Sequence, residues 1–172
     1  MKATIILLAI CTLSIGCISF NQNNSQDNGG TPYPKGKTAI KDTLTPVEKS
    51  PSKWKEILDD KSYYVLREKG TERAFSGEYN KHYKKGTYCC KGCGLPLFKS
   101  EDKFNSGTGW PSYTNFINNH VEHVADGSHG MIRTEVVCNR CKGHLGHVFE
   151  DGPAPTGLRY CINSLSLEFE KE

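Results

Sequence analysis

Eight cysteines are the most chemically informative residues of this 172-residue chain, at positions 11, 17, 89, 90, 93, 138, 141 and 161. Four of them form two Cys-x-x-Cys pairs, Cys90–Cys93 and Cys138–Cys141, followed by Gly94 and Gly143, which tolerate the positive φ of tight turns. Two such turns can supply four thiolates to one tetrahedral zinc ion. Four protein ligands leave no open position, so the predicted zinc is structural rather than catalytic. Disulfides or an iron centre are the alternatives.

Two other cysteines, Cys89 and Cys161, remain as candidates for a reactive thiol. Cys89 lies beside Cys90, and three roles are open for it: a packed bystander, a resolving thiol, or a metal ligand through a one-residue slip. The slip would create a Cys-x-x-x-Cys spacing that matches the second pair less well. Spacing alone therefore leaves Cys89 unassigned.

The segment around Cys161 alternates as a strand does. In an extended strand Arg159, Cys161 and Asn163 project on one face, while Tyr160 and Ile162 point to the other. A guanidinium and an amide beside a thiol favour the thiolate, which predicts a reactive cysteine. The alternative is a buried and unreactive cysteine, which is common for this residue type.

This strand cannot continue unbroken without a conflict. Leu165, Leu167 and Phe169 have the same parity as Cys161, so an uninterrupted strand would put apolar residues on its face. Either the site borders the core directly, or a bulge near Ser164 shifts the phase.

The first 16 residues are typical of an export signal. The apolar run over residues 3–10 is shorter than the roughly 20 residues that span a bilayer. Gly16 before Cys17 resembles a bacterial lipoprotein signal, although Ser14 stands where such signals favour leucine. We therefore expect a signal peptide at 1–16, lipidation of Cys17 and attachment to a bacterial envelope membrane. An ordinary signal peptide or an uncleaved anchor is the alternative.

The segment 17–45 is predicted to be a flexible tether, because residues 21–30 are polar and poor in apolar groups. The folded domain is expected at 46–172, with a short helix over 54–58 behind Ser52 as N-cap. The formal charge of +3, from 22 Lys+Arg and 19 Asp+Glu, lacks the basic excess of proteins that bind phosphate backbones. Nucleic acid is therefore not an expected partner.

A string of motifs over about residues 52–170 resembles the B-type methionine sulfoxide reductases. The motifs occur in the family's order at 87–94 (TYCCKGCG), 97–98 (LF), 103–104 (KF), 106–112 (SGTGWPS), 144–149 (HLGHVF), 151–153 (DGP) and 159–164 (RYCINS). The resemblance implies a mainly β fold of two antiparallel sheets with short N-terminal helices, and a zinc site away from the active site. It also implies reduction of methionine-R-sulfoxide, free or in proteins, by a thioredoxin-like donor.

The resemblance assigns Cys161 as the nucleophile. A sulfoxide needs a proton on its departing oxygen, and His144 and His147 are the expected donors, brought together by a turn at Gly146. The resemblance further implies that Trp110 packs against the substrate methyl group. Phe149 is expected to extend this wall, and Arg159 and Asn163 to stabilise the thiolate and bind the sulfoxide.

One departure from the family concerns recycling of Cys161. Many members have a resolving cysteine where this chain has Thr108, so either Cys89 or an external thiol must reduce the sulfenic acid. Two other functions remain as alternatives: a zinc-ribbon binding module, and a general thiol oxidoreductase, which the lone Cys161 disfavours because it lacks a Cys-x-x-Cys partner.

Overall fold

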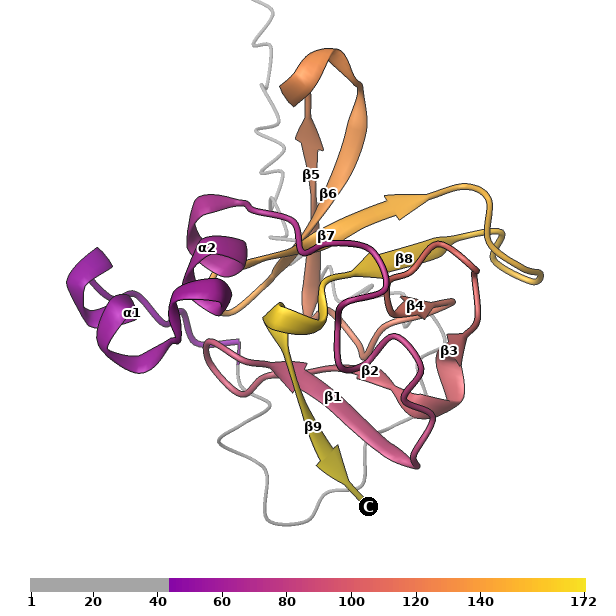
Figure 1. Cartoon of the computed structure of the whole chain (residues 1–172), viewed down its shortest axis with the longest axis horizontal. Helices are drawn as coiled ribbons and strands as arrows, with labels where there is room; N and C mark the ends of the chain where they lie inside the picture. Colours follow the sequence, from indigo (N-terminus) through magenta and orange to yellow (C-terminus); the bar gives the residue numbers. More distant parts are fainter. Residues whose placement is uncertain (1–43) are drawn as a thin grey trace, which may run out of the picture.

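The computed structural model describes residues 44–172, whose arrangement is shown in Figure 1. The helices and strands are α1 (Pro51–Ile57), α2 (Asp60–Glu68), β1 (Gly86–Cys90), β2 (Pro96–Lys99), η1 (Ser100–Asp102), β3 (Lys103–Phe104), β4 (Ser112–Tyr113), β5 (Val121–Asp126), η2 (Ser128–Gly130), β6 (Arg133–Cys138), β7 (His144–Phe149), β8 (Arg159–Ile162), η3 (Ser164–Ser166) and β9 (Leu167–Lys171).

The strands form two antiparallel sheets, as predicted. One has the order β2-β1-β9 and the other β3-β4-β8-β7-β6-β5. The two helices lie together beside the sheets, and the β5–β6 hairpin projects from the body of the protein (Figure 1). The prediction of a mainly β fold with two sheets and short N-terminal helices is therefore confirmed.

Side-chain caps explain where the helices begin. The Ser50 hydroxyl accepts a hydrogen bond from Lys53 N at 3.2 Å, and Pro51 occupies the first turn, where its missing N–H does no harm. The expectation that Ser52 caps this helix was wrong, because the helix already includes it. Asp59 caps α2 in the same way, by accepting from Ser62 N at 2.9 Å.

Aromatic and aliphatic side chains from both sheets form one core. Phe98 of β2 stacks on Tyr113 of β4 with ring centroids 4.4 Å apart, and Tyr88 of β1 meets Tyr113 edge-on at 5.3 Å. Tyr160 and Ile162 of β8 are also buried here, as their parity predicted. The core therefore fixes the face on which Cys161 projects.

The expected conflict of strand phase is resolved by a break in the chain. Strand β8 ends at Ile162, and the 3₁₀ turn η3 separates it from β9, which joins the other sheet. Leu167 is buried in the core without sharing a strand with Cys161. The irregularity near Ser164 is thus a change of sheet rather than a single bulge.

The predicted signal peptide, the lipidation site Cys17 and most of the predicted tether lie outside the described residues. Within residues 44–172, no helix has the length and apolar character needed to cross a bilayer.

Candidate active site and cysteine cluster

The four cysteines of the two Cys-x-x-Cys pairs converge on one point. Their sulfur atoms all lie within 4.8 Å of one another; Cys90 Sγ is 3.6 Å from Cys141 Sγ, and Cys93 Sγ is 3.5 Å from Cys138 Sγ. These separations are far longer than the roughly 2.05 Å of a disulfide and near the roughly 3.8 Å expected around a tetrahedral ion with 2.3 Å bonds. The donor set therefore fits a thiophilic metal ion, and Cys89 is not among the four.

The cluster joins the two sheets. Cys90 ends β1 and Cys138 ends β6, so each strand carries one pair into the turn that follows it. Gly94 adopts φ +72°, as predicted, but in the second turn the left-handed residue is Lys142 at φ 56° and not Gly143. Gly143 instead packs closely against α2, where an added Cβ would lie 2.9 Å from the Leu66 side chain and 3.6 Å from the Leu66 backbone oxygen. A larger residue at this position would require the Leu66 side chain to shift.

A separate cleft of about 140 Å³ lies on the larger sheet. Its lining residues come from β6, β7, β8, the residue that follows β8, and two loops: Thr71, Trp110, Arg133, Gly146, His147, Phe149, Cys161, Ile162 and Asn163. The volume is below the roughly 300–1,000 Å³ of pockets that enclose whole drug-sized ligands, so it suits the end of one side chain. None of the four clustered cysteines lines this cleft.

The register of β7 and β8 places Cys161 directly opposite His147. Directly opposed residues in an antiparallel pair have Cβ atoms about 4.5–5.5 Å apart on the same face, so the thiol and the imidazole project side by side into the cleft. His147 Nε2 lies 2.8 Å from Asp126 Oδ2, and this carboxylate also pairs with Arg133 at 2.7 Å. Asp126 thereby fixes the orientation of the His147 ring.

His144 lies behind His147 rather than in the cleft. Its ring centroid is 5.4 Å from that of His147, its Nδ1 is 2.7 Å from Glu135 Oε1, and burial lowers its pKa. Val137 faces His144 and Val136 faces Gly146, so a bulge in β7 changes the strand phase and brings the two rings together. The predicted proximity is thus present, but its cause is a bulge rather than a turn at Gly146.

Opposing influences act on the Cys161 thiol. Burial raises its pKa, whereas the Arg159 charge and hydrogen bonds from Thr108 and Arg159 lower it, and the net effect is a raised pKa. Arg159 is held by Asp151 through Nε at 2.8 Å and a second nitrogen at 2.9 Å, and its guanidinium lies 4.5 Å from the centre of the Phe149 ring. The predicted influence of Arg159 on the thiolate has the expected sign, but burial outweighs it.

Glu72 connects the parts of the cleft, although it belongs to no motif that would single it out. Its backbone carbonyl accepts from Trp110 Nε1 at 3.1 Å, and its backbone N–H donates to Asn163 Oδ1 at 3.0 Å. Glu72 is buried, with 7% of the residue exposed, and its carboxylate accepts from the backbone N–H groups of Ser164 at 2.8 Å and Leu165 at 3.0 Å. Burial raises the pKa of this carboxyl. One residue therefore holds Trp110, Asn163 and the start of η3.

Cys89 is not brought to the cleft. It is the last but one residue of β1, in the smaller sheet, with only 1% of its surface exposed. It does not appear among the residues that line the cleft around Cys161. The residue that does contact Cys161 from the glycine-rich loop is Thr108, whose hydroxyl also lies 2.8 Å from Ser106 Oγ.

Several cleft residues could not be singled out from their spacing. Thr71 and Arg133 line the cleft but belong to no chemical motif. Asp126, which holds His147 from outside the cleft lining, is placed opposite Arg133 only by the pairing of β5 with β6. By contrast, Cys161, His147, Trp110, Phe149 and Asn163 were all predicted as site residues, and all five line the cleft. A thiol opposite an imidazole in such a cleft defines a thiol-dependent enzyme on a β-sheet scaffold.

Comparisons with known proteins identify the family. The SelR domain profile matches residues 58–171. The chain is 57% identical to the peptide methionine sulfoxide reductase MsrB of Bradyrhizobium diazoefficiens over 138 residues, which cover 80% of this chain and 98% of that protein. It is 58% identical over 127 residues to the protein of the same name from Methanosarcina barkeri, covering 73% of this chain and 89% of the relative. The chain belongs to the SelR family.

Proposed function

We propose that this protein reduces methionine-R-sulfoxide, free or within proteins, to methionine, with Cys161 as the nucleophile. The observation that carries the proposal is the cross-strand pair of Cys161 and His147 in a cleft that Trp110 and Phe149 also line. The similarity to relatives named peptide methionine sulfoxide reductase MsrB supports the same reaction.

In the proposed reaction the Cys161 thiolate attacks the sulfoxide sulfur while a proton is delivered to the sulfoxide oxygen. The attack forms a bond between the two sulfur atoms while the S–O bond breaks and the protonated oxygen leaves as hydroxide. This oxygen then adds to the Cys161 sulfur as the S–S bond breaks, so the products are methionine and a sulfenic acid on Cys161. His147 is the proton donor in this scheme, with Asp126 holding its ring. His144 supports His147 in this role: the two rings are in contact, and the Glu135 carboxylate holds the His144 ring.

Selection of one epimer follows from the two kinds of wall in the cleft. A sulfoxide sulfur carries a methyl group, an oxygen and a lone pair in a chiral arrangement. Trp110 and Phe149 offer an apolar surface for the methyl group, while His147 offers a polar one for the oxygen. Asn163 is held by Glu72 N and by Leu145 O, so we assign it to keeping the polar side of the cleft in place, with Arg159 stabilising the thiolate.

The Cys161 sulfenic acid is reduced by an external thiol in this proposal, supplied by a thioredoxin-like protein. Cys89 is buried in the other sheet, and Thr108 occupies the position beside Cys161 where many family members have a resolving cysteine. Thioredoxin-dependent turnover of Cys89→Ser tests this directly. Unchanged steady-state turnover is expected, whereas accumulation of oxidised Cys161 would restore the intramolecular route.

We assign structural zinc to the cysteine cluster. The four sulfur ligands would close a tetrahedral shell and tie β1 to β6, which suits a stabilising metal and leaves no position for substrate. The metal therefore contributes to folding, while Cys161 and the imidazoles carry the chemistry.

We further propose that residues 1–16 direct export, that Cys17 carries a lipid, and that residues 17–45 tether the domain to a bacterial envelope membrane. The polar composition of residues 21–30 supports the tether, and the hydrogen bond from Val47 N to Arg140 O at 2.9 Å supports a domain that starts near residue 46. Metabolic labelling with a fatty acid should mark the wild type and not Cys17→Ala. Equal labelling of both would contradict lipidation at this residue.

The decisive enzymatic test uses the two separated sulfoxide epimers of N-blocked methionine with wild type and Cys161→Ser, each with dithiothreitol as reductant. The wild type should reduce only the R epimer, and the variant neither. Reduction of the S epimer, or activity in the variant, would contradict the assignment.

A further inference from the structure

The four cysteines of the cluster differ in how completely the protein covers them. Cys90 and Cys138 are fully buried and Cys141 is 4% exposed, whereas Cys93 is only partly buried. The thiolate is the form of cysteine that oxidants attack, and an accessible thiolate reacts before a buried one. Cys93 is therefore the sulfur of the cluster that is most open to a dissolved oxidant.

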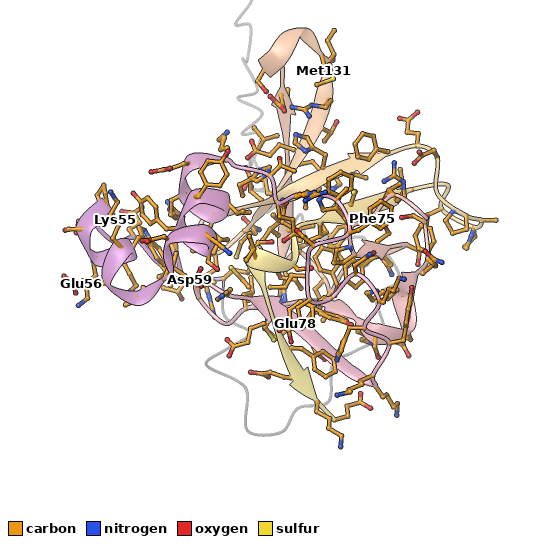
Figure 2. The ribbon with its side chains drawn as sticks, viewed as in Figure 1. Lys55, Glu56, Asp59, Phe75, Glu78 and Met131 are labelled. Carbon is orange, nitrogen blue, oxygen red and sulfur yellow. The ribbon has the colours of Figure 1, made fainter. Side chains whose placement is uncertain are left out.

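The two helices cover the cluster near Cys141. A Cβ added at Gly92 would lie 3.6 Å from the Trp54 ring of α1 and 3.7 Å from Cys141 Sγ, so the helix packs beside this sulfur. Lys91, in the turn of the first Cys-x-x-Cys pair, also forms an ion pair with Asp59 at 2.7 Å, and Figure 2 labels Asp59 where the two helices meet. The helices thus protect one part of the cluster by packing.

Arg140 covers Cys93 instead. Arg140 belongs to the second Cys-x-x-Cys pair, but its side chain crosses to the first: Nε donates to Cys93 Sγ at 3.4 Å, and Nη2 donates to the Cys93 carbonyl oxygen. The guanidinium also lies along the turn, because a Cβ added at Gly94 would be 4.0 Å from Nη2. Arg140 is 6% exposed, so this permanently charged, planar group is held against the partly buried sulfur.

We propose that Arg140 protects the metal-bound Cys93 thiolate from oxidation and so preserves the cluster when the protein meets hydrogen peroxide. The proposal rests on the metal assigned to the cluster and not on the reductase function. In the reaction that Arg140 slows, the Cys93 sulfur attacks one peroxide oxygen, the O–O bond breaks, hydroxide leaves and a sulfenic acid remains on Cys93. The charge-assisted N–H···S bond stabilises the thiolate more than the uncharged product, which raises the barrier to attack. A sulfenic acid lacks the negative charge of a thiolate ligand, so this oxidation releases the metal.

The test measures zinc release from the zinc-loaded, full-length protein by hydrogen peroxide. All samples also carry Cys161→Ser, so that the catalytic thiol consumes no peroxide, and a metal-binding dye reports the zinc that is released. The slope of the initial rate against peroxide concentration measures oxidation, while the intercept measures spontaneous metal loss. Arg140→Met should raise the slope about tenfold. Dimedone added during the first part of the release should label Cys93 before the other three ligands.

Two further variants separate the hydrogen bond from nearby charge and from simple packing. Lys142→Met is the matched control: it removes a positive charge next to Cys141, but this ammonium group bonds to Glu122 and Asn139, and its slope should stay within twofold of the unsubstituted value. Arg140→Lys keeps the charge without the planar fork, should give an intermediate slope, and carries the test if Arg140→Met binds no zinc.

Three results would overturn the proposal. An unchanged slope in both Arg140 variants, with or without a higher intercept, would show that Arg140 only holds the turn. An equal rise of the slope in Lys142→Met would show that any nearby positive charge has the same effect. A protein that binds no zinc would refute the metal assignment together with this proposal, and would leave the reductase function standing.

Discussion

Replacement of Gly146 by alanine should disrupt the pairing of the nucleophile with its proton donor. A Cβ at this position would lie 2.0 Å from the carbonyl oxygen of Cys161 and 3.0 Å from Ile162 Cα, whereas ordinary contact begins at 3.4 Å. The added Cβ and the Cys161 oxygen must therefore move apart by more than about 1 Å, which separates β7 from β8 beside the reacting cysteine. A displacement of this size can lower activity about 100-fold, and overpacking of this kind costs about 1–3 kcal/mol of stability.

The assay compares kcat/KM for N-blocked methionine-R-sulfoxide with thermal unfolding of the same samples. Gly146→Ala should remain folded, with metal content equal to that of wild type, and lose about 100-fold in kcat/KM. Gly127→Ala is the matched control, because nothing lies within 4 Å of its added Cβ and its φ of −100° is ordinary. If folded Gly146→Ala keeps kcat/KM within threefold of wild type, the close approach of β7 and β8 does not position Cys161, and the reasoning fails.

The contacts around the cleft and the cysteine cluster lead to three further predictions. The thiolate is the reactive form and Arg159 lowers the pKa of Cys161, so in Arg159→Met the pH at which kcat/KM rises should be higher. Below that pH, kcat/KM should fall about tenfold relative to wild type for each pH unit of the shift. An unchanged pH profile would contradict this. Glu72→Ala leaves the buried N–H of Ser164 and the partly buried N–H of Leu165 without their acceptor, so urea unfolding should show a loss of about 2–3 kcal/mol. Glu72→Gln retains one acceptor and should lose less. Removal of bound metal with a strong chelator should lower the unfolding temperature, and added zinc should restore it, because the cysteine cluster ties the two sheets together. A metal-free protein with the same unfolding temperature would exclude a structural metal.

Local pattern was sufficient for much of the site. The alternation around Cys161 predicted which neighbours enter the core, and Tyr160 and Ile162 are buried accordingly. The two Cys-x-x-Cys pairs predicted a four-sulfur cluster, and their sulfur atoms do converge. These features depend on spacing within a few residues, so the sequence displays them.

Features that depend on pairing between distant segments were not predictable. The bulge that joins the His144 and His147 rings arises from the register of β6 against β7. Glu72 reaches Asn163 across 91 positions of the chain, and no local signal marks that contact. Two errors at short range have a similar origin: the cap is Ser50 and not Ser52, and the positive φ lies at Lys142 and not at Gly143. In both cases a residue of the preferred type was present, and its type alone did not select the position.

The central claim is that Cys161 takes the oxygen from the R-sulfoxide, and single-turnover trapping tests it most directly. Reduced, full-length protein is mixed with excess N-blocked methionine-R-sulfoxide and dimedone in the absence of any thiol, and the product and the labelled peptides are measured. The account predicts one methionine formed per chain and a dimedone adduct on the Cys161 peptide, with neither formed from the S epimer. Methionine formation without an adduct on Cys161, or with the adduct on the Cys89 peptide instead, would contradict it.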